Sequence, residues 1–237
     1  FTEEGNTYKS ASDGDPNTIT DRQKVAMREV INKPLSLLGC PSRRGGARSF
    51  PKPVDNQGYA YNAADAIGEP FAGRGDYAMN VGDGKDNECN SGPNSLAEAA
   101  DPKYKWCLEG PRGTNIFGRT IATGVSFLRS EVAIRHITDG TSQTYLIGEK
   151  YLNPADYETG LDSADNETWC TGYNNDNYRS TIGLPAPDTY GVRGTKNFGG
   201  VHPGVFYMSY CDGHVEGVSF DIEIAVHRLS GNRRNGS

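Results

Sequence analysis

The chain has 237 residues, with 24 lysines and arginines against 30 aspartates and glutamates, and a formal net charge of −6. No basic cluster is larger than the pair Arg233-Arg234, which argues against nucleic acid as a partner. Thirty glycines, 13 prolines and only 35% hydrophobic residues argue against a helical bundle and predict short elements, many turns and a modest core.

The first predicted element is a helix over Thr18–Ile31. Its apolar residues recur at helical spacing and are Val25, Ala26, Val30 and Ile31. Pro34 ends the pattern. We expect residues 1–34 to form an N-terminal helical segment and residues 35–237 the β-rich body of the same head domain. No apolar run approaches the roughly 18 to 20 residues that span a bilayer.

Two short strands are predicted next, over Leu35–Leu38 and Tyr77–Val81, with residues 42–53 as a loop between them. A polar, irregular excursion follows at about residues 82–110. It opens with acidic residues on a glycine-rich loop, of which we select Asp83, Asp86 and Glu88 as calcium ligands. The alternative is a solvated acidic loop, so the expectation is either no cofactor or calcium.

The chain holds an odd number of cysteines: Cys40, Cys89, Cys107, Cys170 and Cys211. Their scattered spacing fits neither a C-x-x-C metal cluster nor haem attachment. The pair most suited to a disulfide is Cys89 and Cys107, which would staple the first excursion and contribute about 3 kcal/mol. The alternative is five free thiols, and one cysteine stays unpaired within the chain in either case.

Two further strands are predicted, over Val125–Ile134 and Thr144–Leu152, joined by a turn that begins at Asp139-Gly140. We expect both to pair with a C-terminal hairpin in one antiparallel sheet. A second long excursion covers residues 153–197. Its aromatic residues are candidate ligand contacts, namely Trp169, Tyr173 and Tyr178. The alternative is a loop folded on its own aromatic side chains.

The hairpin is predicted from two runs rich in aromatic and branched residues, Val205–Cys211 and His214–Phe220, separated by Asp212-Gly213. A two-residue type I′ turn needs positive φ at both turn positions, which Asp-Gly adopts readily. The register that follows pairs Phe206 with Ser219. One face, expected to pack on the core, then holds Phe206, Met208, Tyr210 and Val215. The opposite face, with Val218 at the open end of the hairpin, is expected to be buried at that end only.

A short helix is predicted to close the chain. Asp221 is its expected N-cap and Gly231 its stop. Four apolar residues at helical spacing are expected to form its buried face, namely Ile222, Ala225, Val226 and Leu229.

Several motifs, in order along the chain, carry a family resemblance. His202 followed after nine residues by Asp212-Gly213 is similar to the H-x9-D-G signature of the bacterial prepilin-type processing-associated family. The other motifs are Cys40-Pro41-Ser42, Asp76-Tyr77-Ala78-Met79-Asn80, Ile137-Thr138-Asp139-Gly140-Thr141-Ser142-Gln143-Thr144, Gly148-Glu149 and Gly231-Asn232-Arg233. The resemblance implies a pilin-like head preceded by a prepilin-like membrane helix, and it makes calcium relevant because some pseudopilins bind it.

A catalytic role for His202 and Asp212 is not expected. Ten residues of strand span roughly 33 Å, so the two side chains would lie at opposite ends of one strand. The same register places His202 opposite Glu223, where it would hydrogen-bond and fix a strand end to a helix start. We therefore expect His202, Asp212 and Gly213 to be structural, like Asp139 and Gly140.

The sequence holds no H-E-x-x-H, G-x-S-x-G or phosphate-loop motif, and we assign no catalytic residue. We expect an α+β fold, mainly an antiparallel sheet with long loops. With the resemblance, the expected function is a non-enzymatic, pseudopilin-like subunit of a cell-surface, periplasmic or extracellular assembly, which binds itself or other pilin-like subunits. The alternatives are a carbohydrate- or ligand-binding surface module and, third, a hydrolase.

Overall fold

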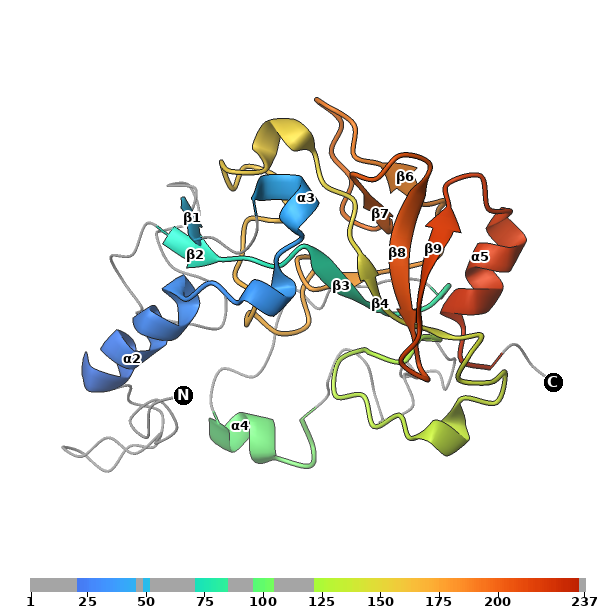
Figure 1. Cartoon of the computed structure of the whole chain (residues 1–237). Helices are drawn as coiled ribbons and strands as arrows, with labels where there is room; N and C mark the ends of the chain where they lie inside the picture. The colour runs from blue at the N-terminus through green and yellow to red at the C-terminus, as the bar shows by residue number, and fades with distance from the viewer. Residues whose placement is uncertain (1–20, 46–48, 52–70, 85–95, 105–121, 235–237) are drawn as a thin grey trace.

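The computed structural model describes residues 21–45, 49–51, 71–84, 96–104 and 122–234. At its centre is a five-stranded sheet with the strand order β5-β3-β4-β8-β9 (Figure 1). The β3–β4, β4–β8 and β8–β9 pairs are antiparallel, and the β3–β5 pair is parallel. The expected α+β class with a mainly antiparallel sheet is therefore confirmed.

The strands of this sheet are β3 (Tyr77–Asn80), β4 (Tyr145–Glu149), β5 (Tyr178–Arg179), β8 (Val205–Tyr210) and β9 (Val215–Ser219). Two small sheets pair β1 (Ser49–Pro51) with β2 (Phe71–Gly73) and β6 (Ala186–Pro187) with β7 (Gly199–Gly200). The α-helices are α2 (Asp21–Asn32), α3 (Pro41–Arg44), α4 (Leu96–Ala100) and α5 (Ile224–Gly231). The 3-10 helices are η1 (Ser36–Leu38), η3 (Ile134–His136) and η4 (Pro154–Asp156).

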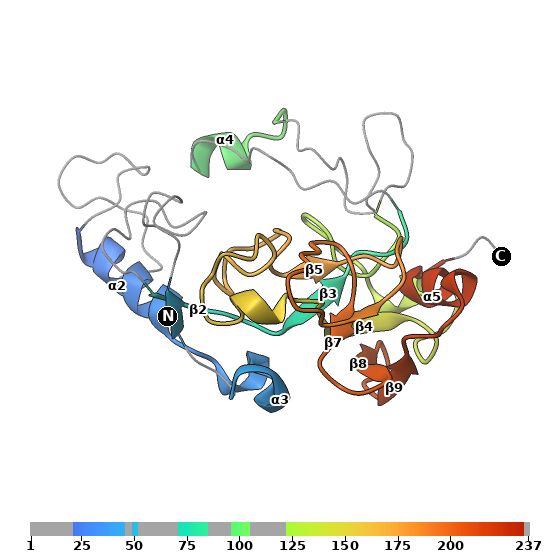
Figure 2. The same ribbon diagram turned by 90° about the horizontal axis from the view of Figure 1, so that it is seen from above.

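The helices lie around the sheet, and α2 and α5 occupy opposite ends of the molecule (Figures 1 and 2). Within the described part of the chain, no helix combines the length and the apolar character that crossing a membrane requires.

The main hydrophobic core lies where β4, β7 and the hairpin meet. Its buried residues are Tyr145, Phe198, Phe206, Met208, Tyr210 and Val218. The strand predicted over Thr144–Leu152 is confirmed as β4, which is central in the sheet, and the one over Tyr77–Val81 is confirmed as β3.

The C-terminal hairpin is confirmed, but its turn differs from the predicted one. The Gly213 N–H donates to the Tyr210 carbonyl at 2.9 Å, and the Tyr210 N–H donates to the His214 carbonyl at 2.9 Å. The loop therefore has three residues, of which only Gly213 has positive φ, at 93°. This is the pattern of a type I turn followed by a glycine bulge, so the predicted type I′ turn at Asp212-Gly213 is wrong.

The longer loop shifts the register of the hairpin by one residue. Phe206 pairs with Val218 rather than with Ser219. A one-residue shift exchanges the two faces of a strand. Val218 therefore lies on the core face beside Phe206, and Val215, which was predicted to be buried, is 65% exposed. On β8 the predicted buried face is confirmed, with Phe206, Met208 and Tyr210.

The closing helix forms, but it begins later and buries another face. Its N-cap is Glu223 rather than Asp221. The predicted buried stripe of Ala225, Val226 and Leu229 is exposed, and Ile222, which precedes the helix, is partly buried against the core. The helix instead buries His227 and Gly231. Gly231 lies against Thr181 with no room for a Cβ, so this side of the helix approaches the body of the protein.

Two predicted strands do not form. Leu35–Leu38 contains the 3-10 turn η1, and Val125–Ile134 consists of turns that lead into η3. Leu37 and Ile134 are 86% and 76% exposed, whereas Phe127 is buried in a small cluster with Ala122. The predicted helix over Thr18–Ile31 is confirmed from Asp21 onward, and its first residues lie outside the described ones.

The end of α5 is tied to the sheet by polar side chains. The Asn80 amide donates to the Tyr145 carbonyl at 2.9 Å and to the Gly231 carbonyl at 2.8 Å. The Arg233 guanidinium donates to the Ala122 carbonyl at 2.8 Å and stacks over the Phe127 ring at 5.3 Å. These contacts give the motif residues Asn80, Gly231 and Arg233 a structural role.

Candidate functional site

The two Asp-Gly turns predicted to be structural lie against each other. The Asp212 N–H donates to the Thr141 carbonyl at 3.2 Å, which joins the β8–β9 turn to the Asp139-Gly140 turn. Gly140 has a φ of 98°. The Asp212 carboxylate accepts a hydrogen bond from the backbone N–H of His214, which lowers the pKa of Asp212. These contacts connect the two turns to each other and are consistent with a structural role for both.

His202 does not lie opposite Glu223 as predicted. β8 begins only at Val205, and His202 lies in the bend before it. From there its Nε2 reaches Glu149 Oε1 at 3.2 Å, and its ring packs edge-on against Tyr207 at 5.0 Å. His202 is hydrogen-bonded as predicted, but it does not fix a strand end to a helix start, because its partner is the last residue of β4.

A third side chain completes this contact. The Cys40 thiol donates to Glu149 Oε1 at 3.5 Å, so the same carboxylate oxygen contacts both the sulfur and the imidazole. The three potential ligand atoms of Cys40, Glu149 and His202 all lie within 4.8 Å of one another. Cys40 and Glu149 are 2% and 1% exposed, whereas the His202 side chain is 26% exposed and lies at the rim.

The backbone holds this cluster in place. Glu149 Oε2 accepts the Tyr207 N–H at 2.8 Å. Gly200 lies so close that a Cβ there would come within 2.9 Å of the same oxygen. Cys40 is fixed by its own N–H, which donates to Asp76 Oδ2 at 2.7 Å. We refer to Cys40, Glu149 and His202 as the Cys-Glu-His cluster.

The cluster is not arranged as a nucleophile with its base. Burial raises the pKa of the Cys40 thiol, the Ser42 backbone N–H opposes this, and the Glu149 carboxylate raises the pKa further. A reactive cysteine needs the opposite environment. The imidazole of His202 also hydrogen-bonds the carboxylate rather than the thiol. Sulfur, imidazole nitrogen and carboxylate oxygen together are instead a ligand set that zinc accepts.

Beside the cluster lies a buried network of ion pairs that begins at α3. Arg43 pairs with Asp188 at 2.8 Å and with Asp76 at 3.4 Å. Arg44 pairs with Asp76 at 2.7 Å and also with Asp165. Residues 42–53 were predicted to be a loop, but both arginines are buried in a helical turn and hold the Asp76 motif in place.

The network continues to Lys150, whose ammonium donates to Asp165 at 2.9 Å. Burial lowers the pKa of Lys150, although Asp165 opposes the shift. Burial alone would raise the pKa of Asp165, but Arg44 and Lys150 outweigh it and hold that pKa below its ordinary value. Burial raises the pKa of Asp176 to about 7. The ion pairs anchor the second excursion to the sheet.

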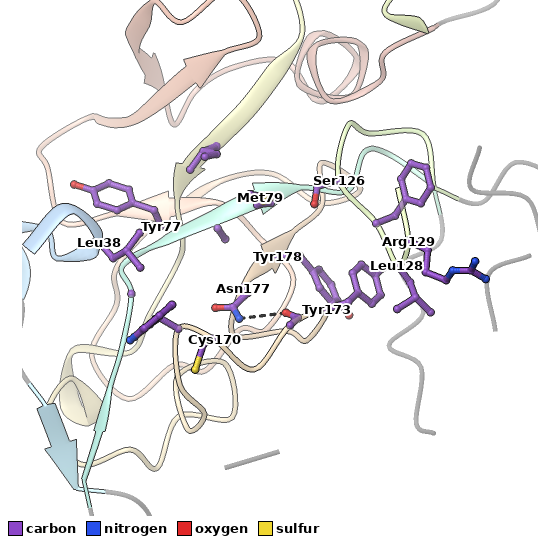
Figure 3. A pocket seen from close by; sticks show the side chains of 16 residues that line it. Leu38, Tyr77, Met79, Ser126, Leu128, Arg129, Cys170, Tyr173, Asn177 and Tyr178 are labelled. Carbon is purple, nitrogen blue, oxygen red and sulfur yellow. Dashed lines mark hydrogen bonds between the residues drawn. The ribbon is translucent and has the colours of Figure 1, made fainter. Parts of the chain in front are cut away.

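The predicted ligand residues Trp169, Tyr173 and Tyr178 line one groove of about 530 Å³ beside β3 (Figure 3). The rings of Tyr173 and Tyr178 stack with their centroids 4.6 Å apart. The Trp169 indole donates to the Lys33 carbonyl at 3.0 Å. Met79, on β3, is 43% exposed and also lines the groove. The structure thus brings the three aromatic residues together on one apolar surface.

The remaining predictions fall mostly outside the described residues. Asp86 and Glu88, proposed with Asp83 for calcium, lie there, as do Cys89 and Cys107 of the proposed disulfide. Asp83 itself accepts hydrogen bonds from Thr123 Oγ1 at 2.6 Å and from the Asn232 amide at 3.0 Å. These contacts tie it to the end of α5.

Sequence reasoning did not select Cys40 or Glu149 as site residues. Both residues belong to motifs that carry the family resemblance, and this is the feature of the sequence that could have identified them as site residues. The contacts join residues 109 and 53 positions apart, so their convergence with His202 becomes visible only in the fold.

Comparison with known proteins gives a family but no characterised relative. No curated protein and no solved structure shows a significant match to the chain. The match to a protein family covers residues 1–225, and the family is described as "Protein of unknown function (DUF1559)". The chain therefore belongs to the DUF1559 family of proteins of unknown function.

Proposed function

We propose that this protein is a non-enzymatic structural subunit, similar to a pseudopilin, of a bacterial cell-surface or secretion-associated assembly. Its partners are further copies of itself, with the head on the cell surface, in the periplasm or outside the cell. The H-x9-D-G resemblance of His202, Asp212 and Gly213 supports this finer assignment within the family.

The observation that carries the proposal is the exposed apolar stripe of α5. Val226 is 47% and Leu229 is 53% exposed, one helical turn apart on the same face. Such a stripe at helical spacing usually packs against a core. Here the opposite face of the helix, with His227 and Gly231, packs against the body. The stripe is therefore available to a second subunit.

The neighbouring strand supports the same surface. β9 is an edge strand of the five-stranded sheet, and its burial pattern leaves four of its five residues exposed. It lies beside α5 in both views (Figures 1 and 2). The outer side of an edge strand presents backbone groups that another chain can pair with. An apolar helix face beside an open strand suits subunit packing.

The contacts of the motif residues support a structural role. Gly140 and Gly213 form turns that lie together, Asn80 ties the last helix to the sheet, and Arg233 bonds the Ala122 carbonyl. The catalytic pair that the H-x9-D-G motif suggests is not supported, because His202 contacts Glu149 while Asp212 contacts His214.

The test is self-association measured by sedimentation velocity over a range of concentrations. We expect the wild type to associate and Leu229→Glu to remain monomeric, because the new carboxylate would be buried at the contact. Leu37→Glu is the control, since Leu37 is 86% exposed and far from α5 in sequence. Electron microscopy of native material then separates polymers from dispersed monomers. A wild type that is monomeric in solution and dispersed by microscopy contradicts the proposal.

A second function, binding of a carbohydrate or another ligand, is favoured by the groove at Trp169, Tyr173 and Tyr178. Sugars stack on aromatic rings, and Tyr173 is only partly buried. A glycan array with wild type and Tyr173→Ala tests this function. A specific signal that the substitution removes supports it, and a blank array contradicts a carbohydrate ligand.

A further inference from the structure

Glu149 differs from the buried carboxylates that pair with the arginines of α3. Asp76 pairs with Arg43 and Arg44, and Asp165 pairs with Arg44 and Lys150. Among the described residues, the one group in contact with Glu149 that can carry a positive charge is the imidazole of His202. Its other partners are a backbone N–H and a neutral thiol. A carboxylate that is 1% exposed requires compensation for its charge.

Two of the spacings in the cluster match those of a tetrahedral zinc site. With metal–ligand distances of about 2.1 Å for nitrogen and oxygen and about 2.3 Å for sulfur, tetrahedral angles put nitrogen about 3.4 Å and sulfur about 3.6 Å from the oxygen. In the structure, His202 Nε2 lies 3.2 Å and Cys40 Sγ 3.5 Å from Glu149 Oε1. The third pair, the Cys40 sulfur and the His202 imidazole nitrogen, lies within 4.8 Å, and side-chain movement that brings it to about 3.6 Å would complete the site.

We propose that Cys40, Glu149 and His202 bind a divalent zinc-like cation, with solvent as the fourth ligand. Thiolate and imidazole ligands favour zinc over magnesium or calcium, which take oxygen ligands. On binding, the Cys40 thiol releases its proton, and the sulfur and Glu149 then supply two negative charges that balance the metal. The buried site becomes neutral, which removes the uncompensated charge of Glu149.

The surroundings support a metal site. Glu149 Oε2 remains bonded to the Tyr207 N–H, which leaves Oε1 as the ligand atom and fixes its direction. The partly exposed ring of His202 provides the side from which an ion enters. The inference is independent of the proposed assembly role.

The experiment is a competition titration of untagged, reduced protein with Zn²⁺ and a coloured chelator, followed by substitution with Co²⁺. We expect one equivalent of Zn²⁺ per chain and, with Co²⁺, the absorption of a tetrahedral site with a thiolate-to-metal band. Cys40→Ser should remove that band. Both Cys40→Ser and His202→Ala should weaken Zn²⁺ binding more than 100-fold, beyond the roughly 10- to 100-fold effect of losing an outer partner.

Matched controls are Cys211→Ser and His214→Ala, because these residues lie near the β8–β9 turn and not in the cluster. Both should bind Zn²⁺ like the wild type. Circular dichroism melts show whether each variant folds. If Cys40→Ser, at a buried position, does not fold, the result rests on His202→Ala, whose position is partly exposed. Absence of a one-equivalent site in the wild type overturns the proposal. So does a site that survives both Cys40→Ser and His202→Ala.

Discussion

Acid should destabilise this fold through His227, and replacing that residue should remove the effect. The ring of His227 lies in the core, with its centroid 5.6 Å from that of Tyr145, 6.3 Å from Phe198 and 6.1 Å from Phe206. Neither ring nitrogen has a hydrogen-bond partner among the described residues. Burial lowers the pKa of His227 to about 4, so the folded protein holds this imidazole neutral.

The sign and size of the effect follow from the two pKa values. An unfolded histidine titrates near about 6.5. Between that value and the folded pKa of about 4, the unfolded chain binds more protons than the folded one, so stability falls as the pH falls. Each pH unit in this window amounts to about 1.4 kcal/mol, which gives a loss of about 2.5 kcal/mol between about pH 7.5 and about pH 4.5.

The assay is urea unfolding of wild type and His227→Leu at both pH values in one buffer. Leucine is close to histidine in size and carries no proton. We expect the variant to gain about 2.5 kcal/mol relative to wild type on acidification. A difference between wild type and His227→Leu that does not change with pH would refute a neutral, buried His227.

Two further predictions concern the network and the turn. Arg44→Met should destabilise the protein by about 3 to 5 kcal/mol, because Asp76 and Asp165 lose a buried ion-pair partner. Urea unfolding measures the change. A loss below about 1 kcal/mol is what an exposed ion pair contributes, and it would contradict a buried network. Gly213→Ala should cost about 1 to 2 kcal/mol, because its φ of 93° is unfavourable for any residue with a Cβ. Asp212→Ala should cost less than Gly213→Ala, since Asp212 loses only exposed hydrogen bonds; thermal melts test this order, and the reverse order would contradict the three-residue loop.

The hairpin illustrates what local sequence can and cannot determine. Asp212-Gly213 between two apolar runs predicts the turn, since both two-residue and three-residue hairpin loops place glycine at a positive φ. The dipeptide does not choose between those loops. That choice decides whether Val215 or Val218 enters the core, and it depends on how the hairpin packs against β4.

The last helix shows the same limit for periodicity. The spacing of Val226 and Leu229 predicts a helix, and the helix forms. Hydropathy then selects the wrong buried face, because the side with His227 and Gly231 fits against the aromatic core and Thr181. Which face is buried depends on shape complementarity with distant residues. An apolar stripe that is exposed for contact with another subunit has the same spacing as one buried within the chain, so periodicity alone does not distinguish the two.

The charge of Glu149 requires an explanation that its structural contacts do not provide. A glutamine at this position would still accept the Tyr207 N–H and a hydrogen bond from His202, so neither contact needs a carboxylate. A carboxylate that is 1% exposed requires compensation if it is to keep its charge. The hydrogen bonds with His202 and Tyr207 involve the carboxylate without the thiol. A bound cation makes the Cys40 sulfur a ligand as well, and the closeness of that sulfur to the same oxygen is what the metal accounts for.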